Sequence, residues 1–386
     1  MEQIGKRGAD ERLDGSQRPS GFDFVLFLAL LPLLAFGLFT INSFSGENVF
    51  FHRQLIWIAL SLSVLVGGSF VDFRFLRKTG ILVVLYLGTL GLLLLLFLSG
   101  SVFQGAQSWF NFGAFAFQPS DPAKLVLILI LAKYFSKRHI EIAHVQHIFV
   151  SGLYTLLIFI PVFLQPDFGS AIIIFAIWFG MVLVSGISKK HLFFVFFGIL
   201  VSFSLAWSFL FQSYQKQRIL TIIHQLTDIR GSGYNAYQST IAVGSGELFG
   251  KGVGYGSQSK LKFLPEYDTV FVFAAFAEEW GFLGVIILFL LFGVIFWRII
   301  DASVHGASNF ETFFCAGLAV LFITHFTVHI GMNIGLLPVT GTTIPFLSYG
   351  GSHLLTEFIG LGILMGMRRY SREVHRGSVN QETLLG

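Results

Sequence analysis

The chain has 386 residues, of which 54% are hydrophobic and only 12% are charged. This charged share is about half that of ordinary soluble domains, so a soluble globular fold is excluded. At about 20 residues per crossing, this much apolar sequence suffices for roughly ten membrane helices. The formal net charge of +4 is interpreted as a topology signal, and no nucleic-acid partner is predicted. The single Cys315 excludes an intramolecular disulfide and a metal site built on cysteines.

Ten apolar runs predict an all-α membrane protein of about ten transmembrane helices. The runs fall at 22–44, 54–72, 80–99, 121–136, 147–164, 169–187, 191–211, 270–297, 311–336 and 351–367. The first run is too long for the core of a signal peptide, so it is predicted to remain as an uncleaved span. We expect a cytoplasmic tail at 1–21, a polytopic membrane domain at 22–368, and a second cytoplasmic tail at 369–386.

Lysine and arginine predict the orientation of these spans. Basic residues close or follow the even-numbered spans at Arg74, Arg77, Lys78, Lys133, Lys137, Arg138, Lys189, Lys190, Arg298, Arg368, Arg369, Arg372 and Arg376. The alternate loops at 100–119, 164–168 and 337–350 contain no lysine or arginine. Because short cytoplasmic loops are enriched in these residues, both termini are predicted to be cytoplasmic. The long segment at 212–269, between spans seven and eight, is then a large extracytoplasmic loop.

That large loop is rich in glycine and polar residues and contains Gln238, Lys251 and Gln258. Glycine lets backbone N–H groups approach an anion closely, and Lys251 within a Gly-Lys-Gly sequence would add charge. The loop is therefore a candidate phosphate-binding segment. A flexible surface loop is the alternative interpretation.

Polar residues also gather at the starts of spans four and six. Asp121 and Lys124 are three positions apart, so on a helix they either pair with each other or hold an anionic ligand. Gln118 and Ser120 precede them directly. Gln165 and Asp167 form a short turn before span six, where Asp167 suits a helix cap or a ligand contact.

Ionisable residues inside spans need partners or an aqueous cavity. Glu278 and Glu279 lie about two turns inside span eight, and we assign them to a buried structural network. His325 and His329 are four apart on span nine and could share a metal, but no third ligand is evident and packing is the favoured interpretation.

The stretch from Pro338 to Ser352 has no charge and is rich in glycine and proline. Gly350 and Gly351 permit tight backbone turns, and Ser348 and Tyr349 offer polar groups beside them. Irregular backbone at membrane depth is tolerated where protein or a cavity covers it. We therefore expect this stretch to line the same pocket as the polar residues at the starts of spans four and six.

Five segments in order resemble one family over nearly the whole chain, the SEDS proteins RodA, FtsW and SpoVE. They are GAQSWFNFGAFAFQPSDPAK at 105–124, QPDFGSA at 165–171, YQSTIAVGSGELFGKG at 237–252, FLPEYDTVFVFAAFAEEWGFLG at 263–284 and NIGLLPVTGTTIPFLSYGGS at 333–352. Within that family the chain looks more similar to RodA than to FtsW.

The resemblance implies ten transmembrane helices with a large loop between the seventh and eighth, in the bacterial plasma membrane. It further implies a peptidoglycan glycosyltransferase that polymerises lipid II, an undecaprenyl-pyrophosphate-linked disaccharide pentapeptide, for elongation, cell shape or division. A class B penicillin-binding protein is the implied transpeptidase partner. Lys124 and Lys251 would meet the pyrophosphate, together with a site that includes Glu266 and Thr269. Mg²⁺ is compatible with this chemistry, but no ligand set with diagnostic spacing is present.

The chain departs from the family at its most important position. An ungapped alignment of 265–278 places the family's catalytic Asp on Val270, which cannot accept a proton, and the family's His on Asp268. Three explanations stay open: Asp268 is the base, the chain is an inactive variant, or the Asp is less essential here. On a helix two residues rotate by about 200°, so substitution by Asp268 requires an irregular start to span eight.

Three functions follow from these alternatives. The first is a lipid II polymerase with Asp268 as general base. The second is a catalytically disabled scaffold that binds lipid II and a transpeptidase. The third is a lipid II flippase, which fits the carboxylates in span eight but lacks a visible inverted repeat.

Overall fold

The computed structural model describes residues 22–44, 49–99, 101–103, 106–113, 115–138, 145–220, 232–261, 263–264 and 266–384. Its long helices are α1 (Phe24–Phe44), α2 (Val49–Ser69), α3 (Thr79–Ser99), α4 (Ser120–Arg138), α5 (Val145–Leu164), α6 (Phe168–Val184), α7 (Lys189–Leu205), α11 (Val272–Val304), α12 (Asn309–Asn333) and α13 (Gly351–Leu384). Each coincides with one of the ten apolar runs. The prediction of a helical, multi-pass membrane protein is confirmed.

Seven of the described helices are long and apolar enough to cross a membrane by themselves, and α6 is a shorter apolar helix. The polar residues of α4 and of the distal part of α13 lower the hydropathy of these two helices. The criterion of helix length and hydropathy therefore identifies seven of the ten spans that the apolar runs predict.

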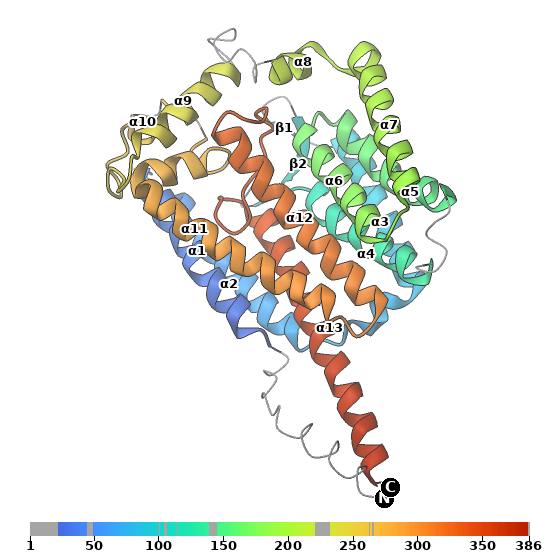
Figure 1. Cartoon of the computed structure of the whole chain (residues 1–386). Helices are drawn as coiled ribbons and strands as arrows, with labels where there is room; N and C mark the ends of the chain where they lie inside the picture. Colours follow the sequence, from blue (N-terminus) through green and yellow to red (C-terminus); the bar gives the residue numbers. More distant parts are fainter. Residues whose placement is uncertain are drawn as a thin grey trace, which may run out of the picture.

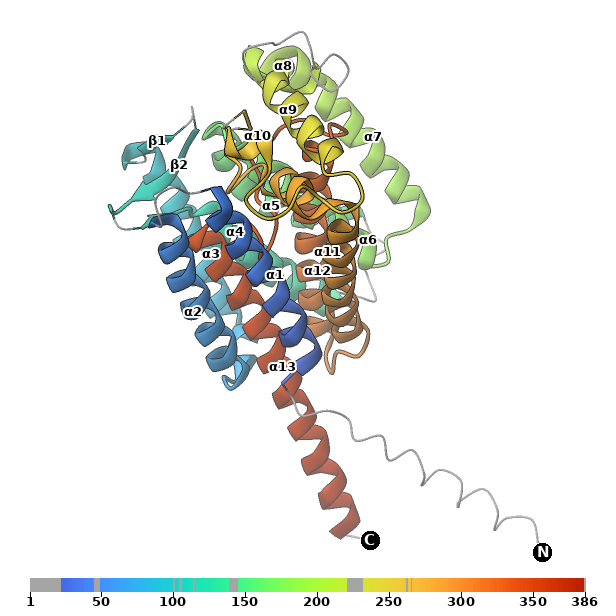
Figure 2. The same cartoon turned by 90° about the vertical axis from the view of Figure 1, so that its left-hand side faces the viewer.

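The two ends of the helix bundle are distinguished by different segments (Figures 1 and 2). The start of α1 and the exit of α13 lie at one end, whereas the small sheet and helices α8, α9 and α10 lie at the other. An ion-pair cluster holds the first end together: Arg298 of α11 and Arg368 of α13 both bind Asp23, at 2.7 and 3.0 Å. We call this end the inner end and the opposite one the outer end.

Helix α12 lies at the centre of the bundle and packs against α4, α6 and α11. Small residues permit the close crossings that membrane helices need. A Cβ atom at Gly317 would lie 2.6 Å from Ile128 of α4. Helix α13 packs chiefly on α2, where a Cβ at Gly68 would lie 3.2 Å from the Cα atom of Gly362.

Outside the long helices, the outer end contains strands and short helices that the apolar runs do not predict. Strands β1 (Ser101–Phe103), β2 (Ala106–Asn111) and β3 (Ala116–Phe117) pair antiparallel in that order. The large loop contains α8 (Ser213–Leu220), α9 (Ser232–Ser245) and α10 (Ser257–Lys260). Alternation of aromatic and small residues over so short a strand is a weak signal beside the long apolar runs.

Two helices differ in shape from the predicted spans. Helix α11 begins at Val272 rather than 270, and its backbone is broken at Gly281, which has φ 64° and ψ −168°. Helix α13 continues to Leu384, beyond the predicted end of the span at 367. It therefore extends past the bundle at the inner end (Figure 2).

Candidate functional site

The starts of α4 and α6 are joined by hydrogen bonds to one carboxylate. Asp167 caps α6 by accepting from the backbone N–H of Ser170 at 3.0 Å. Its other oxygen accepts from Gln118 Nε2 at 2.9 Å and from Ser120 Oγ at 3.2 Å. Gln165 turns away from this group, because its side chain donates to the carbonyl of Leu93 in α3 at 2.6 Å. The structure thus brings together three of these four predicted residues.

Asp121 and Lys124 form the predicted pair on α4. The ammonium nitrogen of Lys124 lies 3.1 Å from Asp121 Oδ1, and both side chains are buried. His353 of α13 contacts the same oxygen through Nδ1 at 3.2 Å. A buried charge is stable only when it is paired, and here one carboxylate oxygen faces two nitrogen donors.

The turn before α11 and the turn before α13 are bonded to each other. Thr269 donates its hydroxyl to Glu266 at 2.9 Å, and the carbonyl of Thr269 accepts from Ser348 Oγ at 2.9 Å. The backbone N–H of Tyr349 donates to the carbonyl of Asp268 at 2.9 Å. These contacts hold Asp268 beside the glycine-rich start of α13.

Asp268 lies in a turn and not in a helix, because α11 begins four residues later. This is the irregular start that substitution by Asp268 requires. Burial raises the pKa of the Asp268 carboxyl, and the negative charge of Glu266 raises it further, while a hydrogen bond from its own backbone opposes them. Burial also raises the pKa of the neighbouring Tyr349 phenol, against a hydrogen bond from Arg53 that lowers it.

Val270 occupies an apolar environment. It packs against a small cluster formed by Ala242, Leu264, Phe271, Ala274 and Ala275. Its backbone carbonyl accepts from Asn333 Nδ2 of α12 at 3.1 Å. The position at which the family alignment places an Asp is therefore filled here by a packed hydrophobic side chain.

Gly350 and Gly351 connect this region to α2. The N–H of Gly350 donates to Gln54 Oε1 at 3.4 Å, and the Gln54 amide donates to the carbonyl of Ser348 at 3.3 Å. A Cβ atom at Gly351 would lie 2.1 Å from the Trp57 indole, so only glycine fits. We call the region formed by Gln118, Asp121, Lys124, Asp167, Asp268, Ser348, Tyr349 and His353 the outer site, because the outer ends of α4, α6 and α13 carry it.

A second polar cluster lies where α11 breaks. Glu278 is fully buried, and Lys251 Nζ lies 2.8 Å from its Oε1. The same carboxylate accepts from the backbone N–H groups of Gln258 and Ser259 at 3.0 and 3.3 Å. Glu279 accepts from the N–H of Gly254 at 2.6 Å. We call this group the α11 cluster.

The α11 cluster changes the interpretation of the glycine-rich segment. The N–H groups of Lys251 and Gly252 donate to the carbonyls of Glu278 and Glu279, at 2.9 and 3.0 Å. These donors cap the interrupted turn of α11. The phosphate-binding interpretation expects N–H groups that are open to an anion, and these two are already bonded. Gln238 lies on α9, next to Ser239, which donates to the carbonyl of Asn333 at 2.8 Å.

Sequence reasoning missed His353, which contributes an ionisable group of α13 to the outer site, and Glu357, which contacts His353 from the next turn of α13. They are four residues apart inside an apolar span, so the rule that singled out Glu278 would also have found them. Gln54 and Asn333 carried no comparable signal, because an amide side chain is not ionisable and the rule for ionisable residues in spans does not apply to it. His325 and His329 each contact a backbone carbonyl, at Thr343 and Thr342, through Nδ1.

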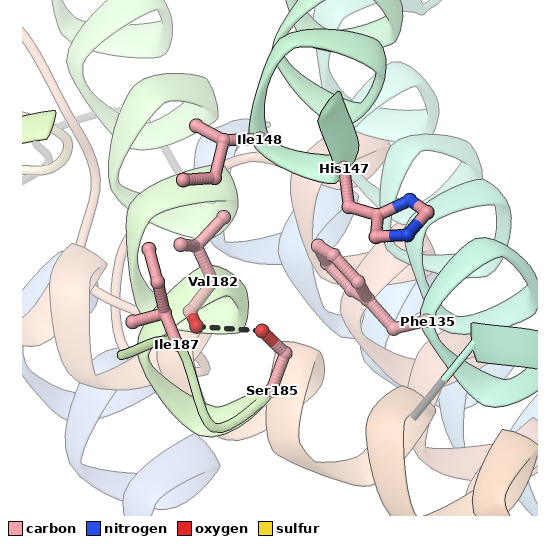
Figure 3. A pocket seen from close by; sticks show the side chains of 6 residues that line it. All are labelled: Phe135, His147, Ile148, Val182, Ser185 and Ile187. Atoms are coloured by element: carbon pink, nitrogen blue, oxygen red, sulfur yellow. Dashed lines mark hydrogen bonds between the residues drawn. The ribbon is translucent and has the colours of Figure 1, made fainter. Parts of the chain in front are cut away.

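Among the described residues, no three His, Cys, Asp or Glu side chains lie together in a way that could hold a metal ion. We therefore derive no step through a metal bound by the protein. A small depression lies at the inner end, lined by Phe135, His147, Ile148, Val182, Ser185 and Ile187 (Figure 3). It shares no residue with the outer site, because it lies at the opposite ends of α4 and α6.

Comparison with known proteins gives concordant results. The profile of the FtsW/RodA/SpoVE family, described as cell cycle protein, matches residues 22–373. Stage V sporulation protein E of Bacillus subtilis is 34% identical over 91% of this chain and 98% of its own length. Peptidoglycan glycosyltransferase MrdB of Escherichia coli is 33% identical over 91% of this chain and 94% of its own.

Solved structures agree with these relatives. A chain from a structure of a peptidoglycan synthase complex that coordinates polymerization and crosslinking has a TM-score of 0.78 at 30% identity, covering 91% of this chain and 98% of that one. The rod shape determining protein RodA of Thermus thermophilus has a TM-score of 0.68 at 29% identity, with 90% and 98% covered. The chain belongs to the FtsW/RodA/SpoVE family of membrane proteins.

Proposed function

We propose that this chain is a peptidoglycan glycosyltransferase that polymerises lipid II at the outer site. The observation that carries the proposal is a relative named peptidoglycan glycosyltransferase that matches 91% of the chain, together with motif residues that meet at one end of the bundle. The bacterial plasma membrane is the corresponding location. Elongation and cell shape are the corresponding process, because the solved relatives include a rod shape determining protein.

Asp268 is the proposed general base. Glycan polymerisation requires a group that removes the proton from the acceptor sugar hydroxyl while the pyrophosphate departs. A partly buried carboxyl with a raised pKa is a stronger proton acceptor than an ordinary aspartate, and Asp268 has this environment. Its place in a turn leaves the side chain free of the helix periodicity that fixes the residues after Val272.

Lys124 is the proposed contact for the departing pyrophosphate within the outer site. Its ammonium group is buried beside Asp121, where a charge acts more strongly than in water. Lys251 is the weaker candidate, because it is bound to Glu278 in the α11 cluster, outside the outer site. The residues proposed to bind the head group are Gln118, Ser120, Asp167, Glu266, Thr269, Ser348 and Tyr349. More distant contacts are proposed for Gln165, Gln238 and Gln258.

A class B penicillin-binding protein is the proposed partner. One similar solved chain belongs to a complex in which polymerization and crosslinking are coordinated. Crosslinking is the work of a transpeptidase, and a helical membrane protein offers many exposed apolar side chains against which a transmembrane anchor can pack.

The second candidate is a scaffold that binds lipid II and its partner without polymerising the substrate. Val270 favours it, because this side chain is packed among apolar residues and cannot take a proton. The scaffold and the polymerase share the same fold and the same outer site, so only an activity measurement separates them.

A gel assay for glycan polymer from labelled lipid II tests the proposal. It uses purified wild-type protein, alone and with the cognate transpeptidase, beside the Val270→Asp variant. Polymer from the wild type supports the polymerase. Polymer from Val270→Asp but none from the wild type would support the scaffold as the function of this chain. Asp72→Asn, at the inner end, is the matched control and should behave as the wild type does.

A further inference from the structure

Ionisable side chains from α4, α12 and α13 meet inside the bundle, and three of them belong to the outer site. Asp121 and Lys124 belong to α4, His325 to α12, and His353 and Glu357 to α13. Asp121, Lys124, His325 and Glu357 are each at most 3% exposed. The rings of His325 and His353 are 4.8 Å apart. Such a concentration of buried charge requires a specific pairing.

The pairing forms a linear series of contacts. Lys124 Nζ and His353 Nδ1 both approach Asp121 Oδ1, at 3.1 and 3.2 Å. On the other side of its ring, His353 Nε2 lies 2.9 Å from Glu357 Oε1, as an ion-pair contact rather than an aligned hydrogen bond. The second oxygen of Glu357 accepts from the backbone N–H of Phe346 at 3.1 Å.

This series links the first turn of α13 to the start of α4. Ser352 Oγ accepts from the N–H of Gln118 at 3.2 Å, and the next residue, His353, contacts Asp121. Two consecutive residues of α13 therefore fix the position of the segment that carries Gln118, Asp121 and Lys124. Glu357 stands one turn further along α13, where it can hold the imidazole from behind.

We propose that His353, held by Glu357, is a positioning residue that sets the orientation of Asp121 and Lys124 in the outer site. Two donors fix Oδ1 of Asp121, whereas Oδ2 is buried with no hydrogen-bond partner. With Oδ1 held, Oδ2 is the carboxylate oxygen left to accept from a substrate donor. The inference rests on the proposed function, because the substrate donor is a group of lipid II.

Charge balance supports this role for an imidazole in particular. Asp121 and Glu357 carry two negative charges against the one positive charge of Lys124. A protonated His353 makes the four side chains neutral, and it is the group that contacts both carboxylates. His325 faces the same group from α12, and its Nδ1 contacts a backbone carbonyl instead.

Two substitutions of His353 separate its two contacts. In His353→Asn the amide nitrogen lies near the place of Nδ1, so the donor to Asp121 is kept and the contact with Glu357 is lost. In His353→Gln the amide reaches toward the place of Nε2, so the contact with Asp121 is lost. Both remove the ring and the charge. His329→Asn on α12 is the control, because its amide nitrogen keeps the place of Nδ1, which contacts the carbonyl of Thr342.

The experiment measures lipid II binding and the kcat and KM of polymer formation at several pH values, with thermal unfolding in detergent alongside. His353→Gln should weaken binding or kcat/KM about tenfold, the usual effect of losing one hydrogen bond to a charged group. His353→Asn should lose about threefold or less, and His329→Asn should match the wild type. Asp121→Asn combined with His353→Gln should be no worse than Asp121→Asn alone.

Equal losses from His353→Asn and His353→Gln, explained by equal falls in unfolding temperature, would overturn the inference and leave a purely structural role. If the wild type binds lipid II but makes no polymer, the polymerase proposal fails, and the inference is decided by the binding affinities. If the wild type does not bind lipid II, both are overturned.

Discussion

Glu278 and Lys251 are unequal partners, although they form one ion pair. Glu278 is fully buried and accepts from several donors, whereas the side chain of Lys251 is 30% exposed. Removing the carboxylate leaves buried N–H groups without an acceptor. Removing the ammonium leaves a carboxylate that retains its other hydrogen bonds.

We therefore expect Glu278→Ala to lower the free energy of unfolding by about 3 kcal/mol or more. Lys251→Ala should cost less than half as much, because its charge is partly hydrated and screened. Thermal unfolding in detergent measures both. Equal costs would mean that the ion pair, and not the backbone donors, determines the stability of the α11 cluster.

The raised pKa of Asp268 gives the proposed reaction a pH dependence. A general base works only when it is deprotonated, so polymerisation should fall as the pH drops through the raised pKa. The acid limb should therefore lie above that of an ordinary aspartate, whose pKa is 3.8. The stability of the fold changes with pH in the opposite direction. The folded state binds the Asp268 proton more tightly than the unfolded state does, so the contribution of Asp268 to the free energy of unfolding decreases as the pH rises from 3.8 toward the raised value.

A pH profile of kcat/KM, measured at lipid II concentrations well below KM, checks the position of that limb, because it reports the pKa of the free enzyme. Glu266→Gln should move it to lower pH, since the neighbouring negative charge is one cause of the shift. An unchanged limb in Glu266→Gln would assign the observed pKa to another group.

The residues of the outer site could be found from sequence only in part. Asp121, Lys124 and Asp167 were recognisable as polar groups at the starts of spans, and the structure pairs them with close neighbours. Lys251 was expected to meet an anion from outside, because sequence spacing cannot show that Glu278 lies beside it. His353 and Glu357 needed only the rule already applied to other spans.

Among the helices, α11 depends on one glycine. Gly281 has a positive φ, and a Cβ atom there would lie 2.2 Å from the nitrogen of Gly250. The break lets the N–H groups of Lys251 and Gly252 reach the carbonyls of Glu278 and Glu279. The α11 cluster and the end of the large loop therefore exist in this form because position 281 has no side chain.

Gly281→Ala should lower the unfolding temperature strongly, because both the backbone conformation and the contact with Gly250 oppose a methyl group. Gly293→Ala in the same helix is the matched control, since nothing lies within 4 Å of its added Cβ. That control should be neutral or stabilise the protein by up to about 1 kcal/mol. Similar unfolding temperatures for the two variants would contradict the break at Gly281.

Helix positions were predictable because apolar runs of this length have few alternatives in a membrane. All ten runs coincide with helices, and most ends differ by a few residues, whereas α11 and α13 continue well beyond the predicted ends of their spans. The exceptions have physical reasons. The break in α11 depends on contacts with Gly250, far away in sequence, and the short strands and α8, α9 and α10 depend on local polar contacts that hydropathy does not register.

At the scale of the whole molecule, the inner end is held by the cluster of Asp23, Arg298, Asp301 and Arg368. Asp23 accepts from two arginines and is nearly buried, so removing its charge leaves both guanidinium groups with one partner fewer. We expect Asp23→Asn to cost about 3 kcal/mol of the free energy of unfolding. Asp72→Asn is the control, because its pair with Arg74 is exposed and should contribute almost nothing.

Thermal unfolding of the two variants separates a buried ion-pair cluster from an exposed pair. A cost for Asp72→Asn as large as that for Asp23→Asn would show that the inner end is not organised by burial. The free energy of unfolding lost in Asp23→Asn should also decrease little in high salt, because salt screens buried ion pairs poorly.

The orientation of the bundle can be tested with the chain's own cysteine as background. Cys315 is buried inside α12, so it should not react with polar thiol reagents. Tyr255→Cys at the outer end and Val304→Cys at the inner end replace side chains that are each 73% exposed. Cytoplasmic termini predict labelling of position 255 from outside intact cells, and of position 304 only after permeabilisation. The reverse pattern would invert the topology.

The role of Asp268 as general base is tested by measuring polymer formation with Asp268→Asn. The substitution keeps the size and the turn while removing the proposed base from the outer site. We expect the wild type, with its transpeptidase partner, to convert labelled lipid II into glycan polymer. Asp268→Asn should lose at least about 100-fold in rate while still binding the substrate. Wild-type rates from Asp268→Asn would contradict the role of Asp268 as general base and show that another group accepts the proton.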